Sequence, residues 1–121
     1  MHYIAKINWA WGNGHTFGEV KEYRIRDRAE LPDVVRQFAA EMTRRYAFDC
    51  GRLDKPLHPY ISSIELVPVQ ESEYLYLDDI GLEGLVDREV AWTRHLIETG
   101  QQYVNGRDNT QPAPEDFGAS A

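Results

Sequence analysis

The chain has a single cysteine, Cys50, among its 121 residues. One cysteine can form neither an intramolecular disulfide nor a cluster of thiolate metal ligands. It follows a predicted helix and adjoins Asp49, and this setting disfavours the thiolate that a nucleophilic cysteine needs. The sequence therefore predicts a structural thiol in a reducing, cytoplasmic location.

Long apolar runs are also missing, since no stretch approaches the roughly 20 residues of a membrane-spanning helix. Residues 1–6 lack the basic and apolar regions of a signal peptide. We expect no membrane partner.

The side-chain patterns that carry chemistry are sparse. The histidines make no i, i+4 metal-ligand pair, and a zinc site on His95 and Glu98 would need two further ligands. Asp78 and Asp79 are adjacent, so on a strand they point to opposite faces. The glycine-rich residues 12–15 lie between two predicted strands, which favours a hairpin turn over a phosphate loop. The sequence predicts no catalytic residue, no metal site and no cofactor.

Basic residues are absent from one long stretch, Pro56 to Asp87, which carries seven carboxylates. Residues 1–55 hold ten Lys/Arg and eight Asp/Glu, whereas residues 56–121 hold three and twelve, so the net charge of −7 comes from the second part. An acidic chain disfavours binding to nucleic acid or to anionic membranes and permits a basic protein partner.

The periodicity predicts an α+β fold in ββαββα order, with a four-stranded, mainly antiparallel sheet and two helices packed on one face. Strands are expected at 3–11, 16–26, 60–69 and 73–78, and helices at 32–48 and 85–104. In the second strand Val20 breaks the alternation, which suggests a bulge near Gly18 or Lys21. We expect one domain over residues 1–104 and a disordered tail over residues 105–121.

The aromatic residues Trp9, Trp11 and Tyr23 have two interpretations. Trp9 and Trp11 share one face of the first strand, which is typical of sheet core beneath a helix. Otherwise Trp9, Trp11, Tyr23 or His15 would lie at the mouth of a ligand pocket between sheet and helices, or the aromatic face would form an interface.

The strand near residues 71–79 is the best candidate for function, because tyrosines alternate with carboxylates that can engage arginines of a partner. The same charges would also keep an edge strand from aggregating. The residues predicted to bind a partner are Glu65, Glu71, Glu73, Tyr74, Tyr76, Asp78, Asp79, Glu83 and Asp87.

The leading hypothesis is a non-enzymatic protein-binding module whose acidic surface mimics nucleic acid and blocks a basic site on its partner. In size and acidity the chain resembles small inhibitors encoded by phages and mobile elements, such as anti-restriction and anti-CRISPR proteins, and immunity proteins that neutralise nuclease toxins. The alternatives are a small-ligand binder or small enzyme with a pocket between sheet and helices, and a subunit of a homo-oligomer.

Overall fold

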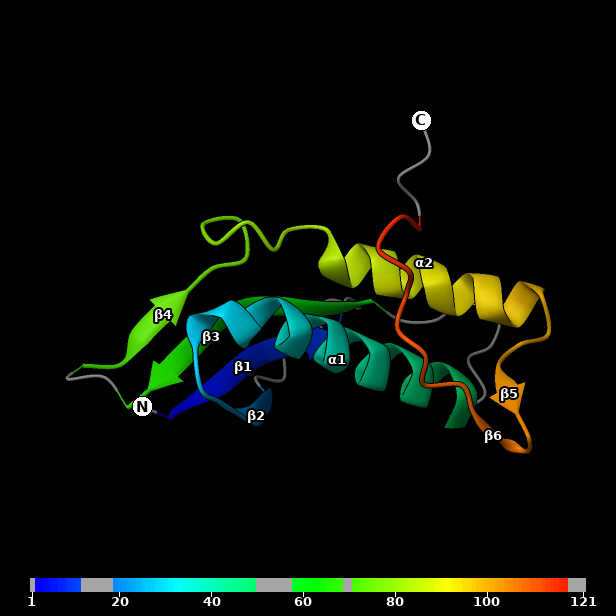
Figure 1. The fold of residues 1–121 in the computed structure, drawn as a ribbon, viewed down its shortest axis with the longest axis horizontal. Coiled ribbons are helices and arrows are strands. Elements are labelled where there is room, and N and C mark those ends of the chain that lie inside the picture. The colour runs from blue at the N-terminus through cyan, green and yellow to red at the C-terminus, as the bar shows by residue number, and fades with distance from the viewer. Residues whose placement is uncertain (1, 12–18, 50–57, 69–70, 118–121) are drawn as a thin grey trace.

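The computed structural model describes residues 2–11, 19–49, 58–68 and 71–117. Four strands form an antiparallel sheet in the order β2-β1-β3-β4. Helices α1 and α2 lie together on the same side of this sheet (Figure 1). The predicted fold class is therefore confirmed.

Strand β1 (Tyr3–Trp11) has the predicted bounds and the predicted faces. Ala5, Ile7 and Trp9 are buried in the core, and Tyr3 and Trp11 pack against it. The period-two alternation of apolar residues placed this face correctly because one side of the sheet is covered by helices.

Strand β2 (Glu19–Ile25) pairs with β1 in an unbroken register. A bulge at Lys21 is therefore wrong, and Val20 simply points outward with 54% of its surface exposed. Gly18 and the turn at residues 12–15 lie outside the described residues. The sheet's irregularity lies instead between β1 and β3 (Pro59–Val67), where Ser63 pairs with Asn8 but Ile61 pairs with Trp9.

Helix α1 (Leu31–Arg44) follows a short 3₁₀ turn, η1 (Arg28–Glu30). Asp27 caps this turn through a reciprocal capping box with Glu30. A π-helical turn, η2 (Arg45–Asp49), continues the chain, so the helical region corresponds to the predicted one. The apolar stripe of α1 covers the sheet through residues such as Val35 and Phe38, which are fully buried.

Strand β4 (Glu73–Leu75) is shorter than predicted and lies at the edge of the sheet. The chain turns at once, with the amide of Asp79 donating to the carbonyl of Tyr76 and that of Leu82 to Leu77. Gly81, at φ 74°, supplies the left-handed conformation that this turn requires. The turn carries the chain from the sheet edge to α2.

Helix α2 (Leu85–Glu98) ends six residues before the predicted limit. Gly100 adopts φ 70°, its amide donates to the carbonyl of Ile97, and the amide of Gln101 donates to that of Leu96. These two hydrogen bonds form a Schellman motif, in which glycine ends a helix. The apolar stripe continues to Val104 in the sequence, but the cap stops the helix first.

Most of the last described segment lies in the region expected to be a disordered tail. Strands β5 (Tyr103–Val104) and β6 (Arg107–Asp108) form a hairpin around Asn105 and Gly106, both at positive φ. Beyond it, the indole Nε1 of Trp92 donates to the carbonyl of Gln111 over 3.1 Å. The Trp92 ring also meets Phe117 edge-to-face, so residues up to 117 pack against α2.

Candidate functional site

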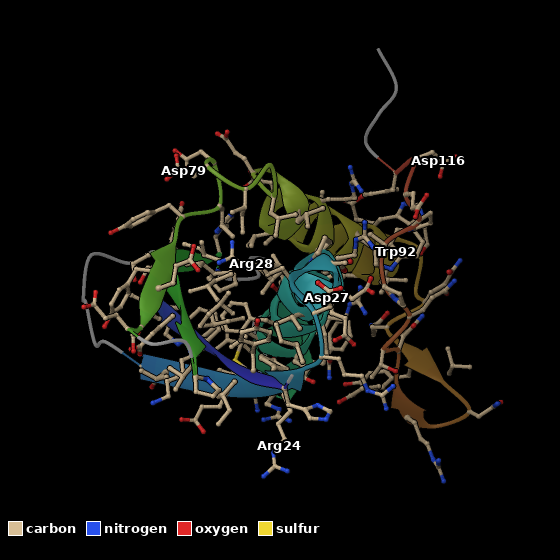
Figure 2. The ribbon with its side chains drawn as sticks, turned by 60° about the vertical axis from the view of Figure 1, so that its left-hand side comes forward. Arg24, Asp27, Arg28, Asp79, Trp92 and Asp116 are labelled. Carbon is tan, nitrogen blue, oxygen red and sulfur yellow. The ribbon has the colours of Figure 1, made fainter. Side chains whose placement is uncertain are left out.

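The predicted acidic surface is spread over β3, β4, the turn at residues 76–84 and the start of α2. Asp79 lies at the outer end of this turn and points away from the body of the molecule (Figure 2). Glu71, Asp78 and Glu83 are also exposed. The acids therefore sit on ordered backbone, but they do not all face the same way.

Glu65 and Tyr74 form one pair on the sheet face opposite the helices. They are direct cross-strand partners on β3 and β4, and their inward neighbours Ile64 and Leu75 are buried. The negative charge of Glu65 raises the pKa of the Tyr74 hydroxyl above its usual value, and a hydrogen bond between the two adds to the effect. Tyr74 is thus tied to Glu65 while half of its surface stays exposed.

Glu73 lies on the other side of β4 and forms an ion pair with Arg28. Arg28 belongs to η1, whose capping box fixes its backbone, and Figure 2 shows its place beside the sheet and helices. Because its charge is already matched, Glu73 is a weaker candidate for partner binding than the sequence suggested.

A shallow groove of about 210 Å³ gathers the other predicted residues. One wall is a run of β3 and the residue before it, and the other is the turn and the first residues of α2. The lining residues are His58, Pro59, Tyr60, Ile61, Ser62, Tyr76, Leu77, Asp78, Glu83, Gly84, Val86 and Asp87. The groove thus brings together Tyr76, Asp78, Glu83 and Asp87 from the predicted set. Its described lining residues include three carboxylates and no lysine or arginine.

Two aromatic side chains and a histidine shape this groove. The His58 ring stacks on Tyr60, with centroids 4.3 Å apart, and its Nε2 bonds to Asp87 Oδ1. Tyr60 and Tyr76 each expose about half of their surface, at 55% and 51%. Tyrosines with exposed faces beside carboxylates can take a cationic side chain by cation–π contact and ion pairing.

The β3 backbone along the groove has a free side within the described residues. Strand β4 pairs only with Ile64, Glu65 and Leu66, and then turns away. Among the described strands, none pairs with residues 59–63 on that side. An unpaired strand edge offers its amides and carbonyls to an added strand.

The predicted aromatic ligand face is part of the core. Trp9 is 5% exposed and meets Trp11 and Phe38 edge-to-face. The Tyr23 hydroxyl donates to Glu41 Oε2 over 3.3 Å; burial, reinforced by Glu41, raises its pKa above the usual value. These contacts favour the core interpretation. His15 and Cys50 lie outside the described residues.

Sequence reasoning missed His58 and Tyr60 as site residues. His58 lies 29 residues before its partner Asp87, so no local spacing connects them. Tyr60 carried no distinctive signal, because tyrosines are common in strands and an exposed one needs no special explanation.

Among the described residues, no three His, Cys, Asp or Glu side chains are grouped so as to hold a metal ion. In the same part of the chain, no helix is long and apolar enough to cross a membrane.

Comparison with known proteins gives no relative from which function can be transferred: no family model matches the chain, and no similar protein was found among curated proteins or solved structures. The groove and its surroundings are therefore the guide to function.

Proposed function

We propose that the chain is a non-enzymatic protein-binding module that captures a basic segment of a partner protein in the groove between β3 and the 76–87 region. The observation that carries this proposal is the groove's composition: its described lining holds three carboxylates and two half-exposed tyrosines, and no lysine or arginine is among those described residues. Such a lining attracts arginine and lysine and repels nucleic acid.

The groove's size favours a side chain over a free metabolite. At about 210 Å³ it lies below the range of roughly 300–1,000 Å³ typical of small-molecule sites. One long basic side chain can enter it, while the neighbouring backbone of the partner pairs with the free side of β3. This would be strand addition, in which main-chain hydrogen bonds give affinity and a pocket gives specificity.

The surrounding acids extend the surface beyond the groove. Glu71 and Asp79 are exposed on the same β4–turn region, outside the groove itself. Together with Asp78 and Glu83 they would attract a partner site that normally binds a phosphate backbone, so that the protein inhibits its partner by mimicking nucleic acid. This is the mode expected of a phage or mobile-element inhibitor.

A pair of charge-matched variants tests the proposal. The first is Asp78→Lys, Asp79→Lys and Glu83→Lys; the second is Glu98→Lys, Glu115→Lys and Asp116→Lys. All six positions are exposed, and Figure 2 shows Asp79 at the upper left and Asp116 at the upper right of the molecule. Each replacement adds two charges, so both variants change from a formal net charge of −7 to −1.

Partners are captured from the native host with the wild type and identified by mass spectrometry, and the affinity of each variant for the captured protein is then measured at low and high salt. We expect the first variant to lose binding and the second to keep it, with the wild-type affinity falling as salt rises. Equal binding by both variants would refute the proposal.

A further inference from the structure

A second and larger cleft lies away from the acidic groove. It has a volume of about 600 Å³, within the range typical of small-molecule sites. Its walls are the outer face of α1, continued into η2, and the segment after β5. The lining residues are Asp33, Arg36, Gln37, Ala40, Glu41, Arg44, Arg45, Asp108, Thr110 and Pro112.

The floor of the cleft follows from the helical repeat. Arg36, Ala40 and Arg44 are four residues apart, so they lie in one row along α1. Alanine carries only a methyl group between two long side chains, which leaves a hollow above the helix. Pro112 lines the same cleft from the C-terminal segment and adds apolar surface.

Arg44 has hydrogen-bond donors that no described residue satisfies. Its side chain is 4% exposed, and Nη2 donates to Glu89 Oε2 over 2.7 Å. Within the described residues, Nε and Nη1 have no hydrogen-bond partner. Buried polar groups in folded proteins are nearly always paired. Arg44 lines the cleft and has two buried nitrogens without an acceptor among the described residues, so its charge is only partly compensated there.

The carboxylates near these arginines are partly engaged. Asp33 accepts from Arg36 Nη1 over 3.2 Å, and Glu41 accepts from Gln37 over 3.0 Å and from Tyr23. In the part of the chain that the structure describes, no ion pair of Arg45 is found. The α1 side of the cleft thus has cationic groups to offer, and the protein's overall negative charge is screened over about 10 Å at moderate salt.

We propose that this cleft binds a small organic acid, with its carboxylate or phosphate on the arginine side and its aliphatic body against Ala40 and Pro112. Guanidinium groups form strong, charge-assisted hydrogen bonds to both kinds of oxyanion. The site is separate from the acidic groove, and its existence does not depend on the proposed protein partner.

The test is a titration of the ¹⁵N-labelled full chain, followed by amide resonances, with succinate, inorganic phosphate and uncharged succinamide as probes. At about 10 mM probe, a site of millimolar affinity is mostly occupied. We expect succinate or phosphate to shift resonances of residues 36–45 and 108–112, and succinamide to leave them unchanged. Comparing the shifts caused by succinate with those caused by phosphate shows whether the cleft prefers a carboxylate or a phosphate.

Two pairs of matched variants locate the site. Ala40→Leu fills the hollow, and Ala91→Leu makes the same change at an exposed position of α2 outside the cleft. Arg36→Gln removes a charge from the cleft, and Arg24→Gln removes one from the exposed face of β2. We expect each cleft variant to bind about tenfold more weakly, because Arg36→Gln loses a charge-assisted hydrogen bond and Ala40→Leu occupies the ligand's space. Each control variant should bind as the wild type does.

The Arg36→Gln pair keeps the test decisive if Ala40→Leu disturbs the fold, because Arg36 is partly exposed. The proposal is overturned if neither acid shifts the cleft resonances, if succinamide acts like succinate, or if both cleft variants that fold bind as the wild type does.

Discussion

Arg44 of α1 and Glu89 of α2 form a buried ion pair, in which Nη2 donates to Oε2 over 2.7 Å and the side chains are 4% and 1% exposed. The other oxygen of Glu89, Oε1, accepts the backbone amide of Ala113 over 2.9 Å. One carboxylate therefore joins both helices and the C-terminal segment. Its role in stability can be tested directly.

We expect Arg44→Met and Glu89→Leu each to lower the free energy of unfolding by about 3–5 kcal/mol, because each leaves one buried charge without its partner. The double variant should lose much less than the sum, since no charge then remains buried. Urea denaturation of all four proteins measures this coupling. Additive losses would show that the pair does not act as a unit.

The pH dependence of this site has a defined sign. Burial raises the pKa of the Glu89 carboxyl above its usual 4.5, against the opposing effects of the Ala113 amide and Arg44. The folded state then binds the proton at a higher pH than the unfolded state does. The resulting stability is present at low pH and is lost as pH rises through the folded-state pKa.

Glu89→Gln, which cannot titrate, is the reference for that measurement. As pH falls from 7 towards 4.5, we expect the wild type to gain stability relative to Glu89→Gln, by at most about 1.4 kcal/mol per pH unit. Urea denaturation of both proteins across this range gives the difference between their free energies of unfolding. The other carboxylates are common to both proteins, so their titration does not contribute to this difference. A relative loss would mean that the ion pair with Arg44 outweighs burial.

The C-terminal segment should contribute to the stability of the folded protein. A chain that stops after Asp108 loses the hydrogen bonds from Ala113 to Glu89 and from Trp92 to Gln111. It also loses those from Asn109 to the carbonyls of Gln101 and Gln102, together with the contact between Trp92 and Phe117. We expect a loss of about 2–4 kcal/mol in the free energy of unfolding.

The fluorescence of Trp92 should also shift to longer wavelength in the truncated protein, since the indole becomes exposed. Phe117→Ala alone should give a smaller effect in the same direction. Unchanged stability after truncation would agree with the disordered tail expected from the sequence.

Trp9 separates the two interpretations of the aromatic residues. As a core residue, Trp9→Ala should cost about 3–5 kcal/mol, because it removes a large side chain that contacts Trp11 and Phe38. Val20→Ala, at an exposed position of β2, is the control and should change stability by less than about 0.5 kcal/mol. Near-wild-type stability of Trp9→Ala in urea would favour the ligand-face interpretation instead.

Local patterns predicted the elements whose signals are complete within a short stretch. The alternation around Ile7 located β1, and the three- and four-residue spacing around Phe38 located α1, because burial on one face imposes those periods. Two shorter signals outweigh this periodicity. Asn105-Gly106 marks a hairpin turn, and Gly100 marks a helix end more strongly than the apolar stripe that runs past it.

The acidic stretch from residue 56 to residue 87 was visible in the sequence by itself, because charge composition does not depend on the fold. Only the tertiary structure divided that stretch, since pairing depends on which segments meet in space. It placed Glu73 against Arg28 and Tyr74 against Glu65, and it assembled the groove from His58 and Asp87. The Arg44–Glu89 pair was likewise hidden, because 45 residues separate partners that only the packing of α1 on α2 brings together.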